Sequence, residues 1–158
     1  MPFFIKKDSK DYWNRYPKHL SDMAEIMAAS KLTPATMYVM GDPTDEKAPT
    51  ALIFTMPPGY VLPAHAHLCE RFEIILEGTM TVDDVELGPG DVMIARSGEV
   101  YGPHIAGPQG CRTLEMFSTL AGAHHQLYST PDGLVPVEFG SWEALKATSA
   151  AVEPAENP

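Results

Sequence analysis

The stretch Gly59-Tyr-Val-Leu-Pro-Ala-His65-Ala-His67, which continues to Gly78, decides the fold and the candidate site. Alternate side chains of a β-strand share one face, so His65 and His67 point the same way. If that face is the interior of a barrel, the two imidazoles can meet one metal ion at about 2.0–2.2 Å. A His-x-His pair alone is a weak signal, because two polar residues on an ordinary strand give the same pattern. The surrounding sequence therefore has to decide between the two interpretations.

Short apolar segments, separated by turns rich in Gly, Pro and Asp, follow one another on both sides of this stretch. We expect strands at residues 36–40, 50–56, 60–67, 72–76, 79–82, 92–95, 101–106 and 112–118. Many short strands at close spacing are typical of a β-sandwich or a β-barrel. The sequence therefore predicts an all-β barrel over residues 35–120.

The two ends of the chain differ from this pattern. Residues 1–34 form an expected N-terminal extension with short helices near residues 11–16 and 21–30. Residues 121–158 form an expected C-terminal segment with a short helix at 141–147, capped by Ser141, and a frayed tail from residue 148. The chain of 158 residues fits one domain with these appendages.

Composition and charge narrow the classes of partner. Apolar residues make up 44% of the chain and the formal net charge is -10, without a Lys- or Arg-rich stripe. Such a surface repels nucleic acids and anionic membranes, so we expect a small-molecule substrate instead. No apolar run is long enough to span a membrane, and the first residues lack the pattern of a secretory signal. Because a chain of this size with only two cysteines, Cys69 and Cys111, more often keeps reduced thiols, we expect a cytoplasmic protein.

The chain resembles the cupin superfamily over this strand-rich region. The residues in register with the two cupin motifs are Gly59, His65, His67 and Gly78 for the first, and Gly90, Asp91 and Gly98 for the second. The resemblance implies a single jelly-roll β-barrel with a metal ion in its mouth.

The chain departs from the usual cupin ligand set of three histidines and one glutamate. Arg71 stands at the Glu position of the first motif, and Tyr101 stands at the His position of the second. His104 can supply the third imidazole if a bulge shifts the strand register. Glu73 can act as a ligand or support one, because strand parity puts it on the face of His65 and His67. Tyr101 is the weakest alternative ligand, because the pKa of a free phenol is near 10.

We therefore expect His65, His67 and His104 to bind a divalent metal ion. Three neutral ligands leave the ion its full charge and open positions, which attract an anionic chelate such as an enolate. This set is similar to that of the three-His cupin dioxygenases, such as the acetylacetone-cleaving ones, and the resemblance implies Fe(II), with Zn(II), Mn(II) or Ni(II) as alternatives. Tyr101, Arg71 and Glu73 are the expected catalytic residues, which would orient the substrate or move protons. The structural alternative for Arg71 is an ion pair with Glu73 or a position at the rim of the barrel.

Two other functions remain open, because cupins carry out many reactions. The first is a non-redox lyase, isomerase or cyclase that uses its metal as a Lewis acid. The second is a non-catalytic barrel that binds a small molecule. Because open barrels leave sheet edges exposed, we also expect a homodimer to which the N-terminal extension contributes.

Overall fold

The computed structural model describes residues 35–138, with ten strands and one short helix in that range. The helices expected at residues 11–16, 21–30 and 141–147, and the tail from residue 148, lie outside it.

A larger antiparallel sheet forms most of the barrel. Its strands follow the order β1 (Ala35–Val39), β2 (Thr50–Met56), β8 (His104–Phe117), β5 (Arg71–Val82) and β6 (Val85–Leu87). Two more strands pair alongside this order, β3 (Val61–Leu62) with β8 and β7 (Val92–Ala95) with β5.

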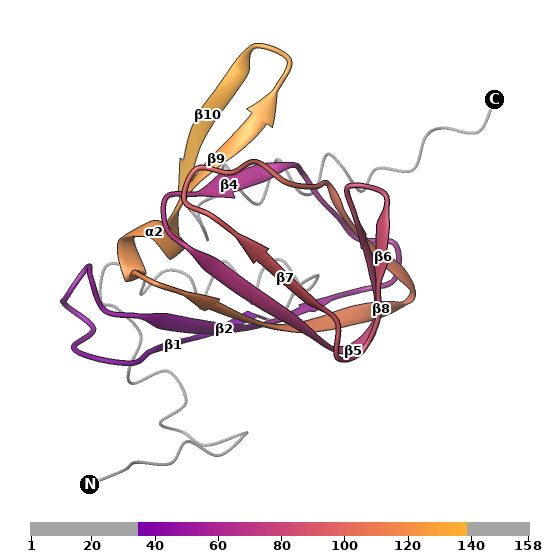
Figure 1. Cartoon of the computed structure of the whole chain (residues 1–158), viewed down its shortest axis with the longest axis horizontal. Helices are drawn as coiled ribbons and strands as arrows, with labels where there is room; N and C mark the ends of the chain where they lie inside the picture. The colour runs from indigo at the N-terminus through magenta and orange to yellow at the C-terminus, as the bar shows by residue number, and fades with distance from the viewer. Residues whose placement is uncertain (1–34, 139–158) are drawn as a thin grey trace, which may run out of the picture.

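A smaller sheet closes the other side of the barrel. It contains β4 (His65–His67), β9 (His125–Thr130) and β10 (Gly133–Glu138), and the short helix α2 (Leu120–His124) leads into β9. Figure 1 shows β4 and β9 across the barrel from β1 and β2, with the β9–β10 hairpin extending outward. An isolated bridge between His65 and Tyr101 joins β4 to the segment that precedes β8.

The expected all-β class is confirmed, but the division into strands differs from the expectation. The strands at residues 50–56 and 92–95 agree with it. The segments 72–76 and 79–82 form the single strand β5, and 101–106 and 112–118 contribute to the single strand β8. Register shifts between Ile75 and Glu77 and between Gly78 and Met80 keep these two long strands paired through the turn-like residues. The strands β6, β9 and β10 and the helix α2 were not expected.

Gly78 is required where β5 pairs with β8 beside the register shift. A Cβ atom at this position would lie 2.0 Å from the carbonyl oxygen of Gly110, and the φ angle of +72° is itself unfavourable for other residues. The glycine that ends the first motif therefore allows the backbones of the two longest strands to approach each other.

Alternation along the strands separates an interior from an outer face. In β2 every second residue is buried, and the same pattern covers the first half of β5. The interior is apolar over much of the barrel, with a core that includes Met37, Leu52, Phe54, Met56, Ile75 and Met80. Cys69 and Cys111 are buried in the same core and are both free.

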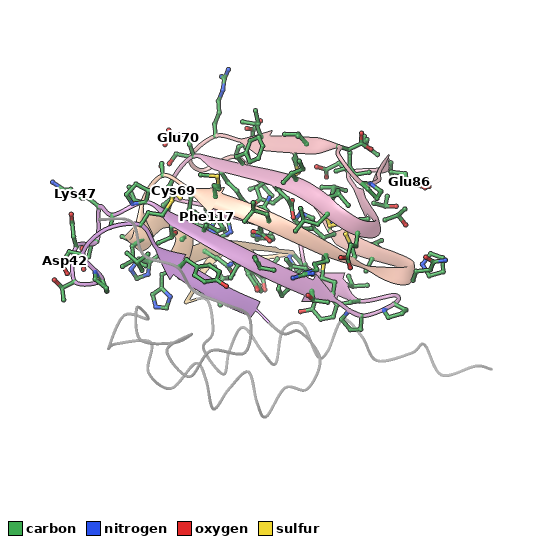
Figure 2. All side chains as sticks on the ribbon, turned by 90° about the horizontal axis from the view of Figure 1, so that it is seen from below. Asp42, Lys47, Cys69, Glu70, Glu86 and Phe117 are labelled. Atoms are coloured by element: carbon green, nitrogen blue, oxygen red, sulfur yellow. The ribbon has the colours of Figure 1, made fainter. Side chains whose placement is uncertain are left out.

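The side chains fill the space between the two sheets. In Figure 2 the loop with Asp42 and Lys47 lies at one end of the barrel and Glu86 of β6 lies at the other. Cys69 and Phe117 lie toward the end of Asp42 and Lys47. Within residues 35–138, no helix has both the length and the apolar character needed to cross a bilayer.

Candidate functional site

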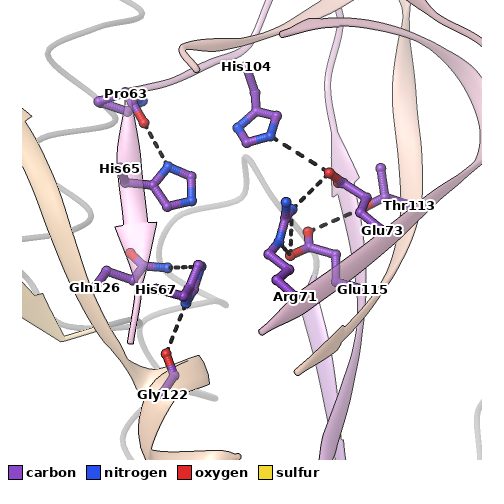
Figure 3. A network of polar contacts seen from close by, with 10 residues as sticks. All are labelled: Pro63, His65, His67, Arg71, Glu73, His104, Thr113, Glu115, Gly122 and Gln126. Carbon is purple, nitrogen blue, oxygen red and sulfur yellow. Dashed lines mark hydrogen bonds and ion pairs between the residues drawn. The ribbon is translucent and has the colours of Figure 1, made fainter. Parts of the chain in front are cut away.

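His65 and His67 are buried on β4, and each ring is oriented by a backbone carbonyl. The Nδ1 atom of His65 lies 2.8 Å from the carbonyl oxygen of Pro63, and Nδ1 of His67 lies 3.0 Å from that of Gly122. A carbonyl oxygen only accepts, so in both rings Nδ1 carries the hydrogen and Nε2 of the neutral ring keeps its lone pair. Figure 3 shows both rings directed from β4 toward the barrel interior.

The helix α2 positions the carbonyl group that orients His67. The side chain of Thr119 caps this helix by accepting from the amide of Gly122 at 3.1 Å. A Cβ atom on Gly122 would lie 2.3 Å from Cβ of Cys69, so only glycine lets the helix pack this closely beside β4. The short helix, which sequence analysis missed, thus fixes the tautomer of a candidate ligand.

His104, at the start of β8, and Tyr101, in the segment that precedes it, approach the same region. The ring centroids of His65 and His104 are 5.4 Å apart, close to the 5.3 Å between His65 and His67. Both ring nitrogens of His104 are buried without a hydrogen-bond partner, and so is the hydroxyl of Tyr101. The ring of Tyr101 lies 4.8 Å from that of His65. Unpaired polar atoms cluster here, which is unusual for a protein interior.

A buried ion cluster lines the wall opposite β4. The Nη2 atom of Arg71 lies 2.9 Å from carboxylate oxygens of both Glu73 and Glu115, and its Nε donates to Glu115 at 3.0 Å. The hydroxyl of Thr113 donates to the other oxygen of Glu115 at 3.3 Å. The Oε2 atom of Glu73 also lies 3.7 Å from Nε2 of His104, which connects the ion cluster to the histidines (Figure 3).

Burial and charge set the protonation states of the site. Burial and the nearby Arg71 lower the pKa of His67 to about 3, and burial together with the neighbouring histidines lowers that of His65 well below its usual value. Burial alone would raise the pKa of Glu73, but Arg71 outweighs it and brings the value to about 2. Burial raises the pKa of Tyr101. At neutral pH the two histidines and the tyrosine are therefore neutral, and Glu73 is ionised.

Glu115 differs from Glu73 although both carboxylates contact the same guanidinium. Burial raises the pKa of Glu115, and the negative charge of Glu73 acts in the same direction, against the opposing effect of Arg71. Two carboxylates that share one buried cation cannot both be fully compensated. The cluster therefore holds its proton more readily on Glu115 than on Glu73.

The structure also brings Gln126 and Tyr128 of β9 to the site, and sequence analysis missed both. Gln126 is buried with its Nε2 atom 3.5 Å from Nε2 of His67, and the ring of Tyr128 lies 5.9 Å from that of His65. A signal for this strand exists, because Thr130-Pro131-Asp132-Gly133 is a turn sequence between two apolar segments. This turn predicts that the two segments form a hairpin. In the first strand of a hairpin, residues then alternate between the inward and the outward face.

The six residues singled out from the sequence all lie inside the barrel. They are His65, His67, Arg71, Glu73, Tyr101 and His104. Arg71 forms the ion pair with Glu73 that was its alternative role, and it also binds Glu115.

Among the described residues, no group of three or more His, Cys, Asp or Glu side chains is close enough to surround a metal ion. The histidine donors nevertheless fit one chemically, since Nε2 of His65 and Nε2 of His67 each carry a lone pair instead of a hydrogen. His124 is buried at the end of α2.

Comparison with protein families identifies residues 52–117 as a cupin domain. This range covers β2 to β8, and so contains both histidines of β4 and the ion cluster. No curated protein shows significant similarity to the sequence.

Solved structures share the fold at low sequence identity. The acetylacetone dioxygenase of Acinetobacter johnsonii superposes with a TM-score of 0.54 at 14% identity, covering 94% of this chain and 94% of that one. The oxalate decarboxylase of Bacillus subtilis gives a TM-score of 0.48 at 18% identity, covering 65% of this chain and 27% of that one. The polyketide cyclase RemF of Streptomyces resistomycificus gives 0.43 at 27% identity, covering 52% and 63%.

This chain thus spans less than two thirds of the decarboxylase and of the cyclase. The likeness to the dioxygenase extends over nearly the whole chain and concerns the fold. The family match shows that residues 52–117 form a cupin domain.

Proposed function

We propose that this protein is a metal-dependent enzyme that binds one divalent cation through His65, His67 and His104. The observation that supports this most is the state of the imidazoles. Two buried rings are tied by Nδ1 to carbonyl oxygens, so their Nε2 atoms carry lone pairs instead of hydrogens, and the third ring has no hydrogen-bond partner on either nitrogen. Buried polar atoms without partners are costly, so a ligand shared by the three rings would remove that cost.

We further propose that the metal is Fe(II) and that the reaction is the dioxygenation of an enolisable carbonyl compound. When bound, the ion would supply positive charge and open positions for an anionic substrate and O2. The three neutral histidines leave that charge uncompensated, which favours the enolate over the neutral ketone. The full-length likeness in fold to an acetylacetone dioxygenase agrees with this choice, although it concerns architecture alone.

The residues around the histidines have separate roles in this proposal. Tyr101 is a neutral phenol with an unpaired hydroxyl, so it can donate a hydrogen bond to a substrate oxygen. Glu73 is ionised and lies beside His104, so its carboxylate can accept a hydrogen bond from the substrate and orient it. Arg71 is held by two carboxylates, which leaves it to fix Glu73 in place. The burial of all three excludes bulk water from the reacting groups.

Metal analysis and oxygen uptake test the proposal together. Protein purified without chelators should contain one divalent ion per chain, and the iron-loaded form should consume O2 with β-diketones or hydroxy-ketones. His65→Ala should lose the metal, whereas His125→Ala should keep it, because His125 is exposed on β9. Unchanged metal content in His65→Ala would contradict any metal-dependent function at this site.

The same experiment separates the redox reaction from its alternative. An iron-loaded protein that consumes no O2 across the panel would contradict the dioxygenase. Turnover of the same substrates with Zn(II) in the absence of O2 would favour a lyase, isomerase or cyclase, in which the ion acts as a Lewis acid.

A further inference from the structure

Gln126 is a buried amide whose hydrogen-bonding capacity is almost unused. It stands directly opposite His67 in the pairing of β4 with β9. Its side chain is 4% exposed, its Oε1 atom has no partner, and its Nε2 atom lies 3.5 Å from Nε2 of His67. Because an amide offers two donor hydrogens and an acceptor oxygen, one contact at the limit of hydrogen-bond distance leaves most of these groups unsatisfied.

The direction of that contact follows from the tautomer of His67. Its Nδ1–H donates to the carbonyl of Gly122, so Nε2 is the acceptor and the amide of Gln126 is the donor. The amide thus points at the lone pair that a cation would use. Once that lone pair is occupied, the donor hydrogens of Gln126 need another acceptor in the same place.

We propose that Gln126 binds the substrate, donating a hydrogen bond from Nε2 to an oxygen of an anion held beside His67. This inference rests on the proposed function, because it needs a cation bound to Nε2 of His67. The ligand class it implies is a small monoanion with two neighbouring oxygens. One wall of its site is then the polar β9 strand, and the hydroxyl of Tyr101 contacts the anion from the segment that precedes β8.

Two alternative roles for Gln126 make different predictions. If its Oε1 atom were itself a ligand to the ion, removing the amide would weaken metal binding. If Gln126 only packed in the core, an apolar residue of similar length would change neither metal nor anion binding. A role in substrate binding leaves metal affinity unchanged and weakens the binding of the anion.

The test uses the full-length protein freed of metal and loaded with Co(II), whose visible spectrum reports bound ligands. Tropolonate, a stable monoanion with two adjacent oxygens, serves as the probe. Gln126→Met should bind Co(II) with the same affinity as the unmodified protein and tropolonate about tenfold more weakly, which corresponds to one hydrogen bond to a charged acceptor. Gln126→Glu, which has the same size but adds negative charge, should weaken tropolonate further. Ser129→Ala, an exposed position on the same strand, is the matched control.

Each result has one meaning. Unmodified protein that binds no Co(II) would overturn the proposed function. Unmodified protein that binds Co(II), together with a Gln126→Met variant of equal tropolonate affinity, would overturn the role of Gln126 alone. Weaker Co(II) binding by Gln126→Met would also overturn it and make Gln126 a metal ligand. If Gln126→Met fails to fold, Gln126→Glu decides, because stronger or equal tropolonate binding by that variant contradicts the proposal.

Discussion

The backbones of His65 and Tyr101 are hydrogen-bonded to each other in both directions, with 3.0 Å from each amide nitrogen to the other carbonyl oxygen. This bridge joins the smaller sheet to the segment that enters β8. The same contact brings the ring of Tyr101 to 4.8 Å from that of His65. The backbone contact that links the two sheets therefore also brings the ring of Tyr101 into the site.

Tyr101→Phe should separate the chemical role of this residue from its structural one. Because the hydroxyl has no partner, we expect the free energy of unfolding to change by less than about 1 kcal/mol, or to increase. Turnover should fall by about 10²–10⁴-fold if the phenol moves a proton in the reaction. Urea titration and steady-state kinetics measure the two effects. A large loss of stability would show that the hydroxyl has a structural partner.

Arg71→Met should destabilise the protein strongly, because it leaves two carboxylates buried without a cation. Breaking a buried ion pair by removing one partner costs about 3–5 kcal/mol. The matched control is Arg112→Met, which removes an exposed pair with Glu77 at 3.4 Å and should cost less than about 1 kcal/mol. Thermal unfolding of both variants at neutral pH measures the difference.

The effect of acid on Arg71→Met provides a second check. The uncompensated carboxylates of Glu73 and Glu115 can take up protons, so lowering the pH should recover part of the lost stability relative to the unmodified protein. Equal losses for Arg71→Met and Arg112→Met would contradict a central role for the buried cluster.

Gly78→Ala and Gly59→Ala form a matched pair that isolates a backbone contact. Their φ angles are +72° and +71°, so both variants carry the same left-handed strain of about 1–2 kcal/mol. Only the Cβ atom at position 78 would meet a neighbour, the carbonyl oxygen of Gly110 at 2.0 Å. We expect Gly78→Ala to fold poorly and Gly59→Ala to remain folded. Similar unfolding midpoints in urea would mean that β5 and β8 can separate at little cost.

The sequence predicts those features of the structure that depend on residues close together in the chain. Strand parity correctly predicts that His65 and His67 face the same way, because the two residues are neighbours on one short strand. Parity also placed Glu73 on their face, but Glu73 belongs to a different strand, β5, and points at the site from the opposite wall. Its ion pair with Arg71 joins residues two positions apart on one strand, so this alternative could be predicted from the sequence.

The partners that come from distant positions could not be predicted in this way. Glu115 and Arg71 are brought together by the pairing of β5 with β8, and Gln126 meets His67 only through the register of β9. Neither register follows from a local pattern, because bulges shift the first and a short helix precedes the second. The turn at Pro131-Asp132-Gly133 was the one local sign that strands continue beyond residue 120.

Metal-free protein should lose stability as the pH falls below about 6.5. The folded-state pKa of His67 is about 3 and its usual value is 6.5, so the unfolded chain binds a proton in this interval and the folded chain does not. His65 shifts in the same direction. Each histidine should contribute a slope of about 1.4 kcal/mol per pH unit within its interval, with stability present above pH 6.5 and lost toward acid. Glu73 adds to this loss below pH 4.5, and Glu115 opposes it.

Urea unfolding between pH 7 and pH 4, with a chelator present, measures that slope. His67→Gln should reduce it by about one proton, since glutamine does not titrate. A pH-independent free energy of unfolding in the unmodified protein would show that the two imidazoles take up protons in the folded chain as they do in the unfolded chain, and would contradict rings held neutral by burial.

The homodimer that we expect should form through β7. This strand pairs with β5 and, within residues 35–138, has no strand on its other side. Its outward side chains are apolar, with Ile94 71% exposed and Val92 43% exposed, although the chain carries a net charge of -10. Exposed sheet edges of this kind pair or become covered, and a contact without charges avoids repulsion between two acidic copies.

Ile94→Lys should therefore reduce the mass in solution, measured by light scattering, from two chains to one. Leu134→Lys, at an exposed apolar position of β10, should leave it at two. A dimer that survives Ile94→Lys but not Leu134→Lys would place the interface on the β9–β10 hairpin, and a single-chain mass for the unmodified protein would exclude the dimer.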